Sequence, residues 1–188
     1  MKINLILLLI VLMAAGAYAY GTKNTNTPIF IKETKKQSQN VEDSNILENF
    51  TYERLNGKKA YLYDHKGRTT LLHFWATWCA PCLIELPQLV DLATLQPNID
   101  ILAISTDQNI DQISRFITKT RKVIPKNFIL ITDAKNEIAQ DRFQTVRLPE
   151  TFILTPALSI HEKIIGAHEE WTSPTMLEKL NTLSYKPE

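Results

Sequence analysis

The chain has 188 residues, of which 44% are hydrophobic and 22% are charged, and its formal net charge is +1 at pH 7. These values are typical of one globular domain with a buried core, and they exclude a disordered or strongly basic protein. A net charge this close to zero gives no reason to expect nucleic-acid binding. We also expect a monomer. Only two cysteines are present, which excludes a disulfide-rich scaffold.

Residues 1–19 predict an export segment. Lys2 precedes an apolar run from Leu5 to Ala19, and the run ends in Ala17-Tyr18-Ala19, a pattern typical of a signal-peptide cleavage site. The run is shorter than the roughly 20 residues of a full span, which favours a cleaved signal peptide, with an uncleaved membrane anchor as the alternative. Either outcome predicts a periplasmic or otherwise extracytoplasmic protein, in a compartment where disulfides persist.

Residues 20–48 are mostly polar and show little apolar periodicity, so they predict a flexible polar tether before a folded domain over 49–188. The domain begins with a hairpin signal, because Asn56-Gly57 separates two partly alternating runs over 50–55 and 58–62. We expect this hairpin at an edge of the main sheet.

The rest of the domain alternates strands and helices. A nearly continuous apolar strand over 70–76, a helix over 81–95 and a second buried strand over 100–106 predict a right-handed βαβ unit with parallel strands. A helix from about residue 110, a strand over 128–132 and a short helix over 136–143 follow. An antiparallel pair over 152–154 and 162–165 and a helix over 174–183 complete an α/β pattern.

The two cysteines form a C-x-x-C pair, Cys79 and Cys82, between a strand and a helix. This context predicts a redox dithiol in which Cys79 is the more exposed sulfur, and the positive end of the helix dipole stabilises its thiolate. Pro81 suits an early helical position. Alternatively, the two cysteines could supply half of the ligands of a zinc site, but the four histidines lack the spacing that structural zinc requires. We expect no metal and no organic cofactor.

These motifs resemble the thioredoxin-like disulfide reductases of the TlpA type, which include membrane-tethered extracytoplasmic proteins that serve cytochrome c maturation. The resemblance extends over about residues 50–183 and rests on residues 75–82, Glu85-Leu86-Pro87, Pro149-Glu150-Thr151-Phe152 and Gly166. It implies a thioredoxin-like fold with a central mixed sheet flanked by helices and an α/β insertion between Asp107 and Asp133. It also implies a cis bond between Leu148 and Pro149, where a substrate strand would pair beside Cys79.

Glu85 follows Cys82 by three residues and so lies on a neighbouring helix face, one turn further along. The resemblance implies that this carboxylate transfers protons at the cysteines, and poor solvation would raise its pKa. His73 stands where related proteins carry aspartate or asparagine. A protonated His73 would stabilise a thiolate and modulate its pKa, whereas a neutral, hydrogen-bonded core histidine is the alternative.

Trp78 adjoins the nucleophile and is expected on the rim that binds substrate, whereas Trp75 is expected in the core. The other histidines, His65, His161 and His168, are expected to be ordinary residues of loops and strand edges.

The sequence therefore predicts an extracytoplasmic enzyme that reduces disulfides in exported proteins. The resemblance implies apocytochrome c as a substrate and a membrane-embedded electron donor that reduces the enzyme again. A thiol oxidase or isomerase of the same fold would use the same cysteines, and a Cu(I) metallochaperone would bind copper between them. A peroxidase is disfavoured because no separate peroxidatic cysteine is present.

Overall fold

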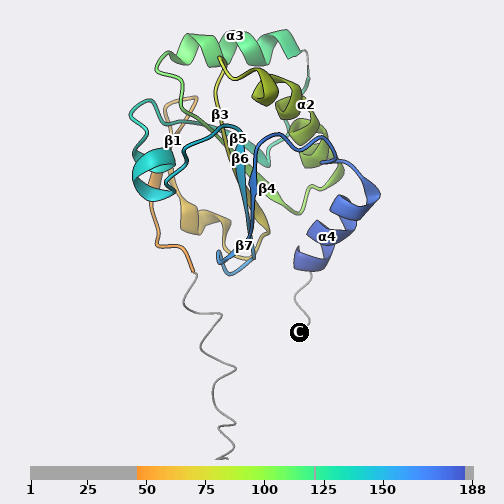
Figure 1. Cartoon of the computed structure of the whole chain (residues 1–188). Coiled ribbons are helices and arrows are strands. Elements are labelled where there is room, and N and C mark those ends of the chain that lie inside the picture. Colours follow the sequence, from red (N-terminus) through yellow and green to blue (C-terminus); the bar gives the residue numbers. More distant parts are fainter. Residues whose placement is uncertain (1–45, 121, 185–188) are drawn as a thin grey trace, which may run out of the picture. The chain divides into compact units, whose positions relative to one another are not determined.

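The computed structural model describes residues 46–120 and 122–184, which form one seven-stranded mixed sheet with helices packed on it (Figure 1). The strand order is β2-β1-β5-β4-β3-β6-β7. The predicted export segment and almost all of the predicted tether lie outside the described residues. In chain order the elements are β1 (Thr51–Arg54), β2 (Lys59–Tyr61), η2 (Leu62–His65), β3 (Thr70–Trp75), α2 (Ala80–Leu95), β4 (Asp100–Ser105), α3 (Ile110–Thr120), β5 (Phe128–Thr132), η3 (Glu137–Arg142), β6 (Glu150–Leu154), β7 (Ile160–Ile165) and α4 (Pro174–Ser184).

The predicted hairpin and its edge position are confirmed. Strands β1 and β2 pair in antiparallel orientation, and β2 ends the sheet. Gly57 in the connecting turn has φ of 77°, a conformation that glycine adopts without the steric cost of a side chain. The hairpin joins the rest of the sheet through the antiparallel pairing of β1 with β5.

Strand β3 lies inside the sheet, where it pairs in parallel with β4 and in antiparallel orientation with β6. All six of its residues are buried, as the continuous apolar run predicts for a strand covered on both faces. Strand β4 pairs in parallel with β5, so the predicted βαβ unit and the predicted helix and strand of the insertion, α3 and β5, are present. The β6 and β7 hairpin forms the other end.

The side chains of β3 alternate between two core layers. Leu71 and Trp75 point toward a layer that also contains residues of α2, α3 and α4, and His73 shares their face by strand alternation. Leu72 and Phe74 point toward a second layer built with η3 and the N-terminal hairpin. The dithiol helix α2 is therefore packed on the Leu71 and Trp75 face of the sheet.

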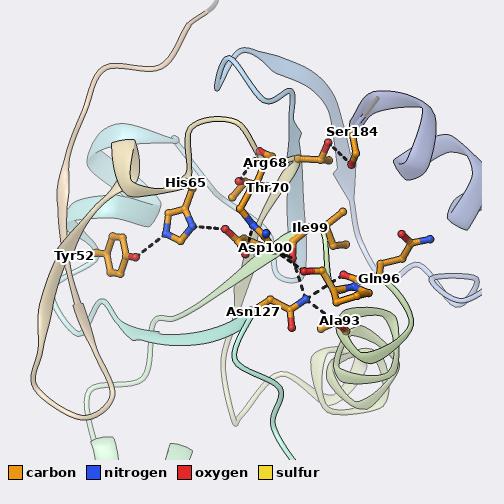
Figure 2. Close-up of polar contacts among 12 residues, drawn as sticks. Tyr52, His65, Arg68, Thr70, Ala93, Gln96, Ile99, Asp100, Asn127 and Ser184 are labelled. Carbon is orange, nitrogen blue, oxygen red and sulfur yellow. Dashed lines mark hydrogen bonds and ion pairs between the residues drawn. The ribbon is translucent and has the colours of Figure 1, made fainter. Parts of the chain in front are cut away.

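A buried polar network lies where β3 and β4 begin (Figure 2). Both ring nitrogens of His65 have partners, because Nδ1 is 2.7 Å from a carboxylate oxygen of Asp100 and Nε2 is 2.8 Å from the hydroxyl of Tyr52. The other Asp100 oxygen is 2.9 Å from Nε of Arg68. The expectation that His65 is an ordinary loop or edge residue is therefore wrong: this buried side chain connects the hairpin to the start of β4.

Residues before β1 already contact the domain. Ile46 forms an isolated antiparallel bridge with Ser159, and the backbone N–H of Leu47 donates to the carbonyl of Leu158 over 3.0 Å. Over residues 46–120 and 122–184, none of the helices has the length and apolar character needed to cross a membrane.

Candidate active site

Cys79 and Cys82 form a disulfide with an S–S distance of 2.02 Å and a Cα–Cα distance of 5.3 Å. The pair follows the carboxyl end of β3, the edge at which open α/β sheets commonly build their sites. Cys79 is the N-cap of α2, and a proline occupies the first turn, where the absence of an N–H costs no helical hydrogen bond. The sequence thus forms the expected strand, turn and helix around the two sulfurs.

The two sulfurs have different surroundings. The Sγ atom of Cys79 accepts a hydrogen bond from the backbone N–H of Cys82 at 3.3 Å, so a free N–H of the helix start is directed at it. Cys79 is 6% exposed and Cys82 is fully buried, so Cys79 is the more accessible sulfur, though less exposed than its loop position predicts. The N–H and the helix dipole both favour a thiolate at Cys79.

Glu85 lies on α2 one turn after Cys82 and is only 2% exposed. Its Oε1 atom accepts a hydrogen bond of 2.5 Å from Nε1 of Trp171, while its Oε2 atom has no hydrogen-bond partner within the described residues. Burial raises the pKa of Glu85 to about 7, and the hydrogen bond from Trp171 and the nearby backbone N–H of His168 oppose the shift in part. A carboxyl with this pKa can gain or lose a proton near neutral pH.

His73 is fully buried in β3, and its Nδ1 atom is 2.9 Å from the hydroxyl of Thr151 on β6. Burial lowers the pKa of His73 to about 3, because a charged imidazole would lose its solvation there. The imidazole is therefore neutral at neutral pH. This arrangement corresponds to the neutral core alternative, and it supplies no positive charge to the sulfurs.

Trp78 and Leu148 line one cavity of about 750 Å³ beside the disulfide. The indole of Trp78 is 71% exposed, whereas Trp75 is fully buried, so the two tryptophans occupy the rim and the core as expected. The remaining walls come from the loop after β4, the start of α3, η3 and residues 145–147. Residues with side-chain amides recur in these walls, namely Gln108, Asn109, Gln112, Asn136 and Gln140.

The bond between Leu148 and Pro149 is cis, as the resemblance implies. The carbonyl of Pro149 accepts a hydrogen bond of 2.9 Å from the backbone N–H of Gly166. Glu150, the next residue, is buried, with its carboxylate 2.9 Å from Nζ of Lys163 and 2.6 Å from the hydroxyl of Thr145. These contacts fix the backbone on both sides of the proline.

Comparison with known proteins identifies the family. The model of the AhpC/TSA family matches residues 44–163, which is more than half of the chain. The chain belongs to this family. The thiol-disulfide oxidoreductase ResA of Bacillus cereus is 29% identical over 141 residues, which cover 70% of this chain and 75% of ResA.

Two solved structures share the fold of this AhpC/TSA protein. StoA from Bacillus subtilis superposes with a TM-score of 0.57 at 23% identity, covering 75% of this chain and 99% of StoA. A secreted disulfide oxidoreductase of Mycobacterium tuberculosis, described as homologous to E. coli DsbE, gives a TM-score of 0.57 at 21% identity and covers 72% of this chain and 93% of its own. Both confirm a thioredoxin-like fold. With its C-x-x-C disulfide and its similarity to ResA, this AhpC/TSA protein is a thiol-disulfide oxidoreductase.

Sequence reasoning missed two residues that support the site. Asp107 follows β4 and holds the loop before Cys79, since its carboxylate accepts hydrogen bonds from the backbone N–H and the hydroxyl of Thr77 at 2.8 and 2.6 Å. Its position after a buried parallel strand, at the same sheet edge as the cysteines, was a usable signal. Trp171, the partner of Glu85, lies 86 residues away along the chain and had no comparable signal.

Residues 46–120 and 122–184 contain no group of three or more His, Cys, Asp or Glu side chains arranged to hold a metal ion. The functional groups gathered at this end of the sheet are thus the two sulfurs, the buried carboxyl of Glu85 and the lining of the adjacent cavity.

Proposed function

We propose that this protein is an extracytoplasmic reductase of protein disulfides, with exported proteins such as apocytochrome c as its substrates. The observation that carries the proposal is the pairing of a helix-capping sulfur, Cys79, with a buried carboxyl, Glu85, one turn after the second sulfur. The first arrangement favours an attacking thiolate, and the second provides a base for the resolving thiol.

The reaction transfers two electrons from the reduced enzyme to the substrate. The Cys79 thiolate attacks one sulfur of the substrate disulfide, whose S–S bond breaks as a mixed disulfide forms and the other substrate sulfur leaves as a thiolate. Cys82 then loses its proton and attacks Sγ of Cys79. The mixed disulfide breaks, the second substrate thiolate leaves, and the Cys79–Cys82 disulfide described above is the oxidised product.

Glu85 acts in the second step. A neutral thiol is a poor nucleophile, so Cys82 requires a base in a place that water does not reach. The Glu85 carboxylate accepts the Cys82 proton, and with a pKa of about 7 the carboxyl can afterwards release that proton near neutral pH.

Trp78, Leu148 and Pro149 form the substrate-binding side of the site. The exposed indole and Leu148 border the cavity beside the disulfide, so a substrate segment on either side of its cysteine can enter there. The amide side chains of the cavity wall suit an extended polar chain, because they offer both donors and acceptors.

The enzyme works outside the cytoplasm, either free after cleavage near Ala19 or held by residues 1–19 in a membrane, with 20–48 as the tether. A membrane-embedded donor of electrons reduces the disulfide again, since an export compartment lacks the thiol reductants of the cytosol. The description of the M. tuberculosis relative as secreted supports this location. Mass spectrometry of membrane and soluble fractions distinguishes an intact N-terminus from one that begins at Tyr20.

The direction of electron flow is tested by the reduction potential of the Cys79–Cys82 couple in dithiothreitol or glutathione buffers. We expect a value near or below the roughly −270 mV of thioredoxin. A value near the roughly −120 mV of strong periplasmic oxidants would reverse the direction and favour the oxidase alternative. Stoichiometric Cu(I) binding without any reduction of a peptide disulfide would instead favour the metallochaperone.

A further inference from the structure

The two oxygens of the buried Glu85 carboxyl differ in their contacts, because only one of them contacts Trp171. The indole Nε1–H is a donor only, so Oε1 must be the acceptor of the 2.5 Å hydrogen bond between them. The unprotonated oxygen of a carboxylic acid is the better acceptor, so this contact favours placing the proton of the neutral carboxyl on Oε2. That atom is buried and has no other partner in the part of the chain that the structure describes.

We propose that Trp171 is a positioning residue that holds Oε1 of Glu85 and so leaves Oε2 as the atom that exchanges a proton with Cys82. This inference rests on the proposed role of Glu85 in resolving the mixed disulfide. It adds a residue from the segment between β7 and α4, far from the C-x-x-C motif in sequence.

The packing around Trp171 suits a fixed donor. Its side chain is fully buried and belongs to the same core layer as Cys79, Cys82 and Leu86. The ring of His168 packs against the indole edge to face, with ring centroids 4.9 Å apart. An indole enclosed in this way has no freedom to turn its N–H elsewhere, so the carboxyl stays in one orientation.

Several titratable groups surround the carboxyl and must be separated from it experimentally. On α2 these are the two cysteines, which do not titrate while they form the disulfide. On β3, which α2 covers, His73 is buried and neutral near pH 7. In the segment before α4, His168 is half-buried, while Glu169 and Glu170 are exposed.

The first experiment measures the indole ¹⁵N–¹H resonance of Trp171 in the oxidised protein between pH 5 and 9. The missing signal of Trp171→Phe assigns the resonance. We expect a single titration that disappears in Glu85→Gln and persists in His168→Gln. A resonance that does not titrate, or a titration that survives in Glu85→Gln, would overturn the proposal. This measurement needs no substrate, so its result is independent of whether the protein proves to be a reductase.

The second experiment follows release of a peptide from its mixed disulfide with Cys79 as a function of pH. Phenylalanine keeps most of the packing but removes the N–H that favours the charged carboxylate. In Trp171→Phe we expect the apparent pKa of the rate profile to rise by about one unit and the rate at pH 7 to fall about fivefold, because less of the carboxyl is ionised.

A double variant distinguishes positioning from packing. In a Glu85→Gln background the further change Trp171→Phe should alter the release rate by less than about twofold, since the contact that it removes is already changed. An equal loss in both backgrounds would show that Trp171 acts only through the fold and would overturn the proposal. Where Trp171→Phe does not fold, as thermal unfolding would reveal, sequential NMR assignment of the wild-type protein identifies the Trp171 resonance among the three indole signals, and that resonance with its Glu85→Gln and His168→Gln controls decides the question.

Discussion

Two regions of the protein hold buried polar groups in opposite states: the start of β3 and β4, and the contact between α2 and the sheet. Where β3 and β4 begin, Asp100 and His65 have partners for both of their side-chain oxygens and both of their ring nitrogens (Figure 2). On the α2 side of the sheet, beyond the start of β3, Oε2 of Glu85 and Nε2 of His73 are buried without partners among the described residues. The two regions share one sheet but differ in how their polar atoms are satisfied.

This difference separates stabilisation from reactivity. A buried polar atom with its partners stabilises one arrangement, and removing a single partner exposes the full cost of desolvation. A buried carboxyl with one unoccupied oxygen is already destabilised as an anion, and that is the condition under which it exchanges a proton near pH 7. We therefore expect changes at the start of β3 and β4 to reduce stability, and changes near α2 to alter the reaction.

Asp100→Ala should have the largest effect on stability. It removes the carboxylate that contacts both His65 and Arg68, so a buried ring nitrogen loses its partner and the guanidinium keeps only the carbonyls of Pro97 and Ile99. We expect a loss of about 3 kcal/mol in the free energy of unfolding, measured by urea denaturation.

The control for this change is Asp111→Ala on the exposed face of α3, which should alter stability by less than about 0.5 kcal/mol. The folded fraction of Asp100→Ala should reduce a peptide disulfide at the wild-type rate. A fully folded Asp100→Ala protein with impaired reduction would break the proposed separation.

Glu85→Gln should lower the rate of peptide release from the mixed disulfide about 10²-fold at pH 7, since it removes the base without changing the shape of the side chain. Glu178→Gln, an exposed change on α4, serves as the control. Stopped-flow measurement of the released thiol gives the rate. An unchanged rate would show that Cys82 is deprotonated by another group.

The same variant should change the pH dependence of stability. Because the pKa of Glu85 is raised from 4.5 to about 7 in the folded protein, the folded state binds the proton more tightly than the unfolded state. Its contribution to stability is therefore complete below about pH 4.5 and is lost as the pH rises through 7. We expect Glu85→Gln to lose less stability than the wild type between pH 5 and 8, measured by thermal unfolding.

Tyr52→Phe should have a smaller effect, a loss of about 1 kcal/mol, because it removes the hydroxyl 2.8 Å from Nε2 of His65 but keeps the packing. Tyr61→Phe, whose ring is half-exposed, is the matched control and should be neutral. Denaturant midpoints compare the two. Equal midpoints for both variants would show that the hydroxyl contributes nothing measurable to the network.

The sequence predicted the elements well where a local pattern determines them. The Asn56-Gly57 turn, the continuous apolar run of β3 and the C-x-x-C pair at a helix start each specify their structure within a few residues. The cis bond before Pro149 came only from the resemblance. What escaped prediction depends on contacts between distant segments: Tyr52 with His65 and Asp100, and Glu85 with Trp171. No periodicity or spacing encodes such contacts.

His73→Leu should have the smallest effect, and its pH dependence should oppose that of Glu85→Gln. Leucine removes an unpartnered nitrogen but also the partner of the Thr151 hydroxyl, so we expect the unfolding free energy at pH 7 to change by less than about 1 kcal/mol.

The change in stability at acid pH distinguishes the contribution of His73 from that of Glu85. Since burial lowers the pKa of His73 from 6.5 to about 3, the unfolded chain takes up the proton first, and stability present above pH 6.5 is lost as the pH falls toward 3. Thermal unfolding of His73→Leu should therefore show a weaker loss in that window. Because the imidazole is neutral at pH 7, the reduction potential should move by less than about 30 mV, the equivalent of roughly 1.4 kcal/mol. A larger shift would mean that His73 carries charge beside the sulfurs, and the difference between the start of β3 and β4 and the α2 side of the sheet would then rest on charge as well as on hydrogen bonding.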